Sequence, residues 1–262
     1  MRVAIMQPTF LPWQGYFELI YQADRFVFAD DAQFSHQSFH QRNRMFVNVK
    51  QGKVAWLSVP IQRESFRMPL NQARIAEAEP WRQKMWRQIE DNYARTPFFR
   101  PVAPAVKEWL LTPAESLAAQ NIAFIRLACD LMGICREFRL TSTRSSGLSR
   151  SARAVDILRW CEADVYLSPR GSFGYMKSDG SFPVDGITAL FQDFQPRPYT
   201  QTGFSGEFVP HLSVLDALFN EGPEVTLQLI RNGTPKWLAW DEMMTLSDTA
   251  PSHDEGAGSE EA

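Results

Sequence analysis

The first thirty-one residues follow the order of apolar and polar positions that is typical of a βαβ unit. A short apolar run at residues 2–6 leads through a loop with two prolines into a brief helical pattern, and a second apolar run at residues 26–29 ends at Asp30 and Asp31. In parallel α/β sheets, ligands bind beyond the carboxyl ends of the strands, often against a helix N-terminus. We therefore expect Gln7 and the two aspartates at one edge of a sheet.

A long helical pattern occupies residues 81–132. Large apolar residues recur every fourth position from residue 81 to residue 93, which places them on one helix face. A later helix in this block is expected to begin at Thr112, a favourable N-cap residue that precedes a proline, and to end at Gly133. The block is interpreted as a helical layer inserted over the sheet.

The rest of the chain alternates between strand-like and helix-like segments. We expect strands at residues 138–141, 163–167 and 188–194, helices at residues 151–161, 212–220 and 223–231, a hairpin formed by residues 45–50 and 54–60, and a polar loop at residues 31–44. Strands that alternate with helices predict an α/β fold with a parallel, Rossmann-like sheet. We expect residues 1–247 to form a single domain.

The charge is unevenly distributed along the chain, which has 27 basic and 30 acidic residues. The segment 248–262 has acidic residues but no Lys or Arg, and it lacks large apolar residues, so it is predicted to be a disordered acidic tail. The nearly neutral remainder argues against nucleic-acid binding driven by bulk charge. The chain has no leader-type start and no run of eighteen apolar residues, so the sequence predicts a cytoplasmic protein without a membrane span.

The first candidate site is the loop after Gln7 together with the start of the following helix. Free N–H groups around Trp13, Gly15 and Tyr16 are expected to point at the strand edge, which suits a phosphate or a carboxylate. The alternative is a tightly packed corner with these aromatic residues in the core.

Asp30 and Asp31, with Gln33 close behind, form the second candidate site. Carboxylates at the end of a strand can bind Mg²⁺, accept a ribose hydroxyl or act as a base. The alternative is ordinary turn chemistry, which Asp favours.

Two basic loops are further candidates. Arg42 and Arg44 flank Asn43, and arginine forks suit phosphate or carboxylate groups. The second basic loop is the Ser-rich stretch from Arg139 to Arg153, which also contains Arg144 and Arg150 and leads into a helix. It is interpreted as a possible anion cradle, with Arg144 and Arg150 as its candidate binding residues. In both cases the alternative is a solvated basic loop.

Histidines and a serine suggest two other kinds of chemistry that the pattern does not favour. His36 and His40 lie four residues apart, which would match a metal pair only within a helix, so no metal ligands are assigned. Ser213 lies between His211 and Asp216, but members of a catalytic triad come from separate elements. We expect Ser213 to be a helix N-cap and Asp216 to complete a capping box with it.

Several motifs together resemble the WbqC-like family, which is met in bacterial surface-polysaccharide gene clusters. The matching segments are Val3 to Phe17 (VAIMQPTFLPWQGYF), Asp24 to Phe34, Asn43 with its two arginines, Trp56 to Pro60, Ala163 to Ser168, Tyr199 to Gln201 and Leu212 to Asn220. The resemblance covers about residues 1–232 and leaves out the acidic tail. It adds Tyr166, Tyr199 and Ser213 to the candidate binding residues. The family often has His at the position of Met6.

The resemblance implies an acyl or aminoacyl (glycine-type) transferase that acts on an amino sugar or similar amine acceptor in glycan (O-antigen) or specialised-metabolite biosynthesis. Gln7 would then orient a carbonyl or phosphate, and Asp30 or Asp31 would act as the general base. Arg42 and Arg44 would bind the donor, which could be a nucleotide or an acyl donor.

Two other functions stay open. The opening unit is also similar to that of adenylyltransferases and pantothenate-synthetase-like enzymes, which implies a nucleotidyltransferase-like sheet and an ATP-dependent ligase or nucleotidyltransferase that uses Mg²⁺. The usual His-x-Gly-His is replaced here by Trp13-Gln-Gly-Tyr16. A non-enzymatic protein that binds a ligand or a partner is the third possibility. The oligomeric state does not follow from the sequence.

Overall fold

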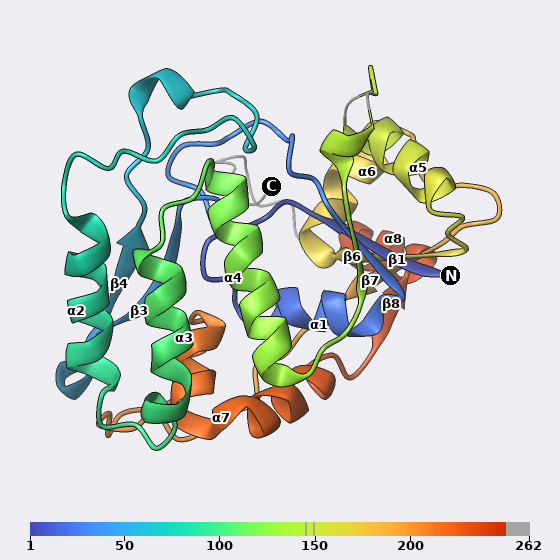
Figure 1. Cartoon of the computed structure of the whole chain (residues 1–262). Helices are drawn as coiled ribbons and strands as arrows, with labels where there is room; N and C mark the ends of the chain where they lie inside the picture. The colour runs from blue at the N-terminus through green and yellow to red at the C-terminus, as the bar shows by residue number, and fades with distance from the viewer. Residues whose placement is uncertain (145, 149, 250–262) are drawn as a thin grey trace.

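A six-stranded sheet forms the centre of the computed structural model, which describes residues 1–144, 146–148 and 150–249 (Figure 1). The strand order is β5-β2-β1-β6-β7-β8. The strands are β1 (Arg2–Met6), β2 (Arg25–Phe28), β5 (Glu137–Leu140), β6 (Val165–Pro169), β7 (Thr188–Gln192) and β8 (Trp237–Ala239). All neighbouring pairs run parallel except β7 and β8. The predicted parallel, Rossmann-like α/β fold is confirmed.

The direction of the chain across the sheet reverses at β1. The strands that follow β1 in sequence first extend the sheet on one side, as β2 and β5, and then on the other side, as β6, β7 and β8. Such a reversal creates a crevice at the carboxyl ends of the two strands beside it, which is where open α/β sheets bind their ligands. Here those strands are β1 and β6, so Gln7 follows directly after one side of the crevice.

The two faces of the sheet are covered by different helices, because side chains alternate along each strand. Ala4 and Phe26 belong to the larger hydrophobic cluster, together with α1 (Gln14–Gln22), α4 (Leu117–Met132) and α7 (Val214–Arg231). Their sequence neighbours Val3 and Val27 belong to the cluster on the other face, with α5 (Arg150–Trp160), α6 (Phe173–Ser178) and α8 (Trp240–Thr249). The sheet is therefore buried on both sides, as parallel sheets are.

A hairpin and three helices are inserted between β2 and β5. The hairpin consists of β3 (Arg42–Asn48) and β4 (Lys53–Ser58), and α2 (Trp81–Tyr93) and α3 (Phe99–Leu111) precede α4. Short 3₁₀ helices lie at Val49–Gln51, Arg63–Ser65, Thr141–Thr143 and Arg170–Ser172. The helical block predicted at residues 81–132 is confirmed, and in Figure 1 its helices stand beside one another at one end of the sheet.

The ends of these helices correct one prediction and confirm another. Thr112 ends α3 instead of beginning α4, because its backbone N–H donates to the carbonyl of Glu108. The N-cap of α4 is Ser116, whose hydroxyl accepts a 3.2 Å hydrogen bond from the N–H of Ala119. Gly133 ends α4 with a φ of 69°, the left-handed conformation that favours glycine.

Other boundaries also differ from the prediction. β3 begins at Arg42, three residues earlier than the expected strand start at residue 45, because an inward-facing polar residue, Asn43, hid the apolar alternation. α6, β8 and α8 were not expected at all. α8 continues to Thr249, past the predicted domain boundary at residue 247. Residues 250–262, which make up most of the predicted acidic tail, lie outside the described residues.

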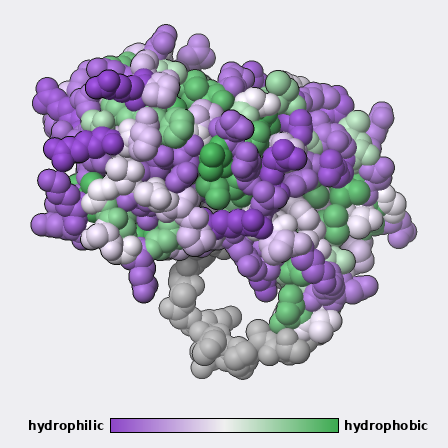
Figure 2. Space-filling model, turned by 90° about the horizontal axis from the view of Figure 1, so that it is seen from below, coloured by the Kyte–Doolittle hydropathy of each residue, from purple (hydrophilic) through white to green (hydrophobic). Residues whose placement is uncertain are grey.

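The surface is mixed in the view from below (Figure 2). Hydrophilic side chains cover most of this face, and hydrophobic ones gather in several small groups. A folded surface of this kind is ordinary for a protein in water. Among the described residues, no helix is long and apolar enough to cross a membrane.

Candidate functional site

A hydrogen bond between Gln7 and His40 lies at the carboxyl end of β1. The amide oxygen Oε1 of Gln7 is 2.5 Å from Nε2 of His40. The N–H of Ser35 donates to the other ring nitrogen, Nδ1, at 3.2 Å. Because Nδ1 accepts, the ring proton is on Nε2, and His40 is the donor to Gln7.

His40 is neutral at physiological pH. The side chain is 2% exposed, and burial lowers the pKa of His40 from 6.5 to about 4. Since its amide oxygen is engaged by His40, Gln7 keeps its amide nitrogen as a hydrogen-bond donor. No described residue accepts from this nitrogen. The pair therefore orients one donor at the edge of the sheet.

The backbone around Gln7 is held by buried side chains. Tyr16 donates from its hydroxyl to the carbonyl of Gln7 at 3.0 Å, and burial raises the pKa of Tyr16, which keeps that hydroxyl protonated. Asn121 of α4 donates to the carbonyls of Pro8 at 2.9 Å and His40 at 2.8 Å. The loop after β1 is thus pre-organised from both sides.

Asn43 stabilises the strained turn in the same loop. Its amide nitrogen donates to the carbonyl of Leu11 at 2.8 Å, and Leu11 has a φ of 46°. A non-glycine residue with positive φ costs free energy and persists only where its surroundings hold it. Asn43 is 1% exposed, so its side chain serves this turn and does not face solvent.

Asp30 joins the end of β2 to the segment after β5. Its carboxylate accepts from the backbone N–H of Ser142 at 3.0 Å, from the Ser142 hydroxyl at 2.5 Å and from the Thr141 hydroxyl at 3.3 Å. Both oxygens of Asp30 are used, and the residue is 4% exposed. Asp30 therefore holds the segment after β2 against the segment after β5.

Asp31 lies closer to solvent and forms an ion pair with Arg153. A terminal guanidinium nitrogen of Arg153 is 2.6 Å from each carboxylate oxygen, and the Thr141 hydroxyl also donates to Asp31. Roughly a fifth to a quarter of each side chain in the pair is exposed, 21% for Arg153 and 24% for Asp31. The pair connects the edge of β2 to α5 on the opposite face of the sheet.

The arginines of the second basic loop are mostly compensated by carboxylates. Arg144, a predicted anion-binding residue, forms a 2.9 Å ion pair with Asp156, and Arg139 pairs with Glu137 at 2.8 Å. Arg150 is exposed at the start of α5 and has no ion pair with a described residue. The stretch from Arg139 to Arg153 itself contains no acid, and the partners lie just outside it, Glu137 at the start of β5 and Asp156 in α5.

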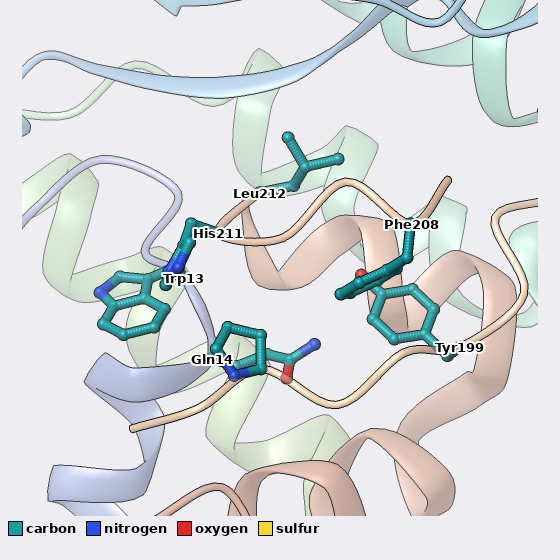
Figure 3. A pocket seen from close by; sticks show the side chains of 7 residues that line it. Trp13, Gln14, Tyr199, Phe208, His211 and Leu212 are labelled. Atoms are coloured by element: carbon teal, nitrogen blue, oxygen red, sulfur yellow. The ribbon is translucent and has the colours of Figure 1, made fainter. Parts of the chain in front are cut away.

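A small aromatic depression lies where α1 and α7 begin (Figure 3). It is lined by Trp13, Gln14, Pro196, Tyr199, Phe208, His211 and Leu212. The rings of Trp13 and His211 lie side by side with centroids 5.0 Å apart. The backbone is fixed here by a bridge between Trp13 and Ser213, and His211 has a φ of 58°. The predicted Trp13, Tyr199 and Ser213 are thus brought together by the fold.

Gln14 contributes a buried hydrogen-bond acceptor to this depression, and Gly15 leaves room for the Trp13 ring. The amide oxygen of Gln14 is buried without a hydrogen-bond donor among the described residues, and the residue is 6% exposed. A Cβ atom at position 15 would lie 2.4 Å from the Trp13 ring, so Gly15 permits the ring to lie over the helix start. A bound molecule with an N–H or O–H group would satisfy the amide oxygen of Gln14.

Asp216 lies behind Tyr199 and is fully buried. It accepts from the hydroxyls of Tyr199 at 2.7 Å and Tyr93 at 2.8 Å, and from the amide of Gln201 at 3.1 Å. Burial raises the pKa of Asp216, and these donors oppose the rise. The predicted capping box is wrong, because the carboxylate binds these side chains while the N–H of Ser213 donates to the carbonyl of Arg44. Ser213 does cap α7, through a 3.3 Å hydrogen bond from Leu215.

Tyr166 and Gln33 lie apart from this edge. Tyr166 is 3% exposed and packs in the hydrophobic cluster of the other sheet face, where burial raises its pKa. Gln33 is exposed and forms a bridge with Pro69. Arg42 and Arg44 are half-buried and belong to β3.

The structure adds residues that sequence reasoning missed. His40 was considered only as half of a metal pair and Arg153 only as part of the second basic loop, and Asn121 and Thr141 were not singled out. Each acts on a residue more than thirty positions away. Among the described residues, no group of three or more His, Cys, Asp or Glu side chains is arranged to hold a metal ion.

Comparisons with known proteins agree on one family. Residues 7–227 match the WbqC-like protein family. The chain is 28% identical over 226 residues to a protein of Mycobacterium tuberculosis named "Uncharacterized protein Rv1507c", and the match covers 85% of this chain and 95% of that protein. No solved structure matches the chain.

Proposed function

Because this chain belongs to the WbqC-like protein family, we propose that it transfers an acyl or aminoacyl group to an amine acceptor at the carboxyl edge of β1 and β2. The observation that supports this most is the Gln7–His40 pair, which orients the amide nitrogen of Gln7 at the end of β1. A fixed neutral donor in that position suits a carbonyl oxygen that gains negative charge during acyl transfer.

The reaction would proceed by direct attack. The nitrogen of the acceptor amine attacks the acyl carbon, a C–N bond forms, and the bond between the acyl carbon and its leaving group breaks. Gln7 donates to the carbonyl oxygen while that oxygen is negatively charged. Asp31, the more exposed of the two aspartates, takes the proton from the amine, and Arg153 fixes the orientation of its carboxylate.

The acceptor and the donor would use neighbouring features. An acceptor such as an amino sugar would lie over the rings of Trp13 and His211 at the rim of the aromatic depression, because the depression itself has room for about one water molecule. Arg42 and Arg44 on β3 suit a phosphate or carboxylate of the donor.

An ATP-dependent ligase or nucleotidyltransferase has less support. That function would use the stretch from Arg139 to Arg153 to bind polyphosphate, yet Arg139, Arg144 and Arg153 are paired with carboxylates. Asp30, the more buried of the two candidate Mg²⁺ ligands, has both carboxylate oxygens occupied by hydroxyl and amide donors.

The test is a transfer assay with the full chain. A panel of acyl and aminoacyl donors is combined with amino sugars, and mass spectrometry detects the acylated acceptor. We expect Gln7→Ala to lower kcat/KM by about a hundredfold, the usual loss for one donor to a developing oxyanion. Gln22→Ala, a glutamine at the other end of α1, is the matched control and keeps full activity.

Asp31→Asn is tested in the same assay, with Asp185→Asn as the matched control in an exposed loop. Asp31→Asn should remove most of the turnover, because an amide cannot take the proton from the attacking amine. Full activity of both the Gln7 and the Asp31 variants would reject the proposed site, and no product with any donor would reject the proposed reaction.

A further inference from the structure

The outward face of the β3–β4 hairpin combines exposed aromatic rings with arginines. Arg44 is the register partner of Trp56, and Arg42 is the partner of Ser58, so these residues share one face of the hairpin. The other face is apolar and buried, with Met45 and Leu57 in the larger hydrophobic cluster. The hairpin thus has one face in the core and one face that is not needed for packing.

Trp56 is unusually exposed for its size. Trp56 is 39% exposed to solvent, and the neighbouring Phe39 is 37% exposed. The two rings meet edge-on with centroids 5.5 Å apart. Large aromatic side chains normally contribute to stability by burial. Trp56 and Phe39 instead form an exposed aromatic surface, and surfaces of this kind often bind a ligand or another protein.

The arginines give the same face its charge. The guanidinium of Arg42 lies 4.3 Å from the centre of the Trp56 ring, and a terminal nitrogen of Arg44 is 3.5 Å from the carbonyl of His211. No described carboxylate pairs with Arg44, in contrast to Arg144 and Arg153, which are paired with Asp156 and Asp31. An anion would therefore find the guanidinium of Arg44 on the same face of the hairpin as the exposed indole of Trp56.

This face borders the candidate site. Phe39 directly precedes His40, and its carbonyl accepts a 2.8 Å hydrogen bond from the N–H of Phe10 in the loop after Gln7. At its other end, Arg44 contacts His211, whose ring lies beside Trp13. A molecule on the hairpin face can therefore extend toward the edge where Gln7 lies.

A ligand that joins a flat ring to an anion could contact both the exposed aromatic rings and the arginine of this surface. Aromatic side chains stack with the faces of nucleobases, and arginine forks bind phosphates. We propose that the outward face of the β3–β4 hairpin binds a nucleotide, with the base against Trp56 and Phe39 and the phosphate at Arg44. The proposal rests on the proposed function, in which this nucleotide is the part of the acyl donor that does not react.

The experiment measures binding without turnover. The full chain is titrated in a calorimeter with AMP, coenzyme A, adenosine, inorganic pyrophosphate and glucuronate, with no acceptor present. We expect AMP or coenzyme A to bind at least tenfold more tightly than adenosine or pyrophosphate, because only a nucleotide supplies both the ring and the phosphate. The comparison of AMP with coenzyme A distinguishes an adenylate donor from a thioester donor.

Variants of the hairpin face test the two contacts separately. Trp56→Ala should weaken nucleotide binding about tenfold and leave pyrophosphate binding unchanged, while Trp56→Phe, which keeps a ring, should bind nearly as tightly as the unaltered chain. Arg44→Ala should weaken both nucleotide and pyrophosphate binding and reduce the salt dependence. Because Trp56 and Arg44 are on the surface, circular dichroism should show that these variants are folded.

Two sets of results would overturn the proposal. Equal binding of pyrophosphate and nucleotide, or an unchanged affinity in Trp56→Ala, would show that no base is recognised. Tighter binding of glucuronate than of any nucleotide would assign the face to an acidic sugar instead. Nucleotide binding without transfer to any acceptor would reject only the proposed function, and transfer from donors that do not compete with nucleotides would reject only this proposal.

Discussion

Arg153 approaches both carboxylate oxygens of Asp31 at 2.6 Å although 122 positions separate the two residues in the sequence. Asp31 follows β2, and Arg153 belongs to the first half of α5. Both side chains are largely shielded from water, so removal of one leaves a charge that is only partly compensated.

We predict that Arg153→Ala lowers the free energy of unfolding by about 1–3 kcal/mol, the usual cost of leaving a shielded polar partner without its bond. Urea denaturation followed by circular dichroism measures it. In a double-mutant cycle with Asp31→Asn, the two losses should not add, because both remove the same interaction. Additive losses would show that the ion pair is energetically silent.

The neutral His40 predicts a dependence of stability on pH. Burial lowers its pKa from 6.5 to about 4 in the folded state, so the unfolded chain binds more protons between these values. Stability is therefore fully present above pH 6.5 and falls as the pH is lowered toward 4, by up to about 3 kcal/mol. His40→Gln, which cannot take up a proton, should show a shallower decline over this window. Unfolding curves at pH 4.5, 5.5 and 7 provide the comparison, and parallel declines would contradict the assignment.

We predict that two tyrosine-to-phenylalanine substitutions have unequal effects on the free energy of unfolding, because only one of the tyrosines donates to the carboxylate of Asp216. Tyr199→Phe removes one of its donors and leaves a buried oxygen short of a partner, so we expect a loss of about 1–3 kcal/mol in unfolding free energy. Tyr21→Phe is the matched control, because the Tyr21 ring stacks with Arg136 and Arg231 while its hydroxyl has no described partner. Its effect should be close to zero in the same thermal and urea measurements.

Gly15 predicts a steric effect on the aromatic depression. Gly15→Ala would place a methyl group 2.4 Å from the Trp13 ring, so the ring must move at a cost of about 1–3 kcal/mol, and the tryptophan emission should change. Gly174→Ala in α6 has open space around the new methyl group and should be neutral or slightly stabilising. Equal stability of the two variants would show that the ring adapts freely.

The sequence allowed the fold and the edge of the site to be predicted because both depend on local patterns. Short apolar runs placed β1 directly before Gln7 and β2 just before the two aspartates, and apolar residues recurring on one helix face placed α2 to α4. The hydrogen bonds and ion pairs of these residues depend instead on how segments distant in the sequence come together in the fold. Nothing near Asp31 in the sequence indicates Arg153.

Buried polar residues explain most of the remaining differences. Asn43, Asn121 and Asp216 are polar and would be assigned to the surface by pattern alone, yet each is at most 1% exposed and satisfies a backbone or side-chain partner. These side chains are buried because they form hydrogen bonds with backbone carbonyls or hydroxyl groups. Those partners are identified only once the helices, strands and loops are placed in three dimensions.

The insertion between β2 and β5 also has a consequence for synthesis. A chain leaving the ribosome presents Gln7 and both aspartates with its first thirty-one residues, but the hydroxyls and the guanidinium that bind those aspartates follow at residues 141–153. Until then, β2 lacks its outer neighbour and exposes an unpaired edge. The hairpin and helices made in the interval are therefore the parts able to shield the nascent strands from association with other chains.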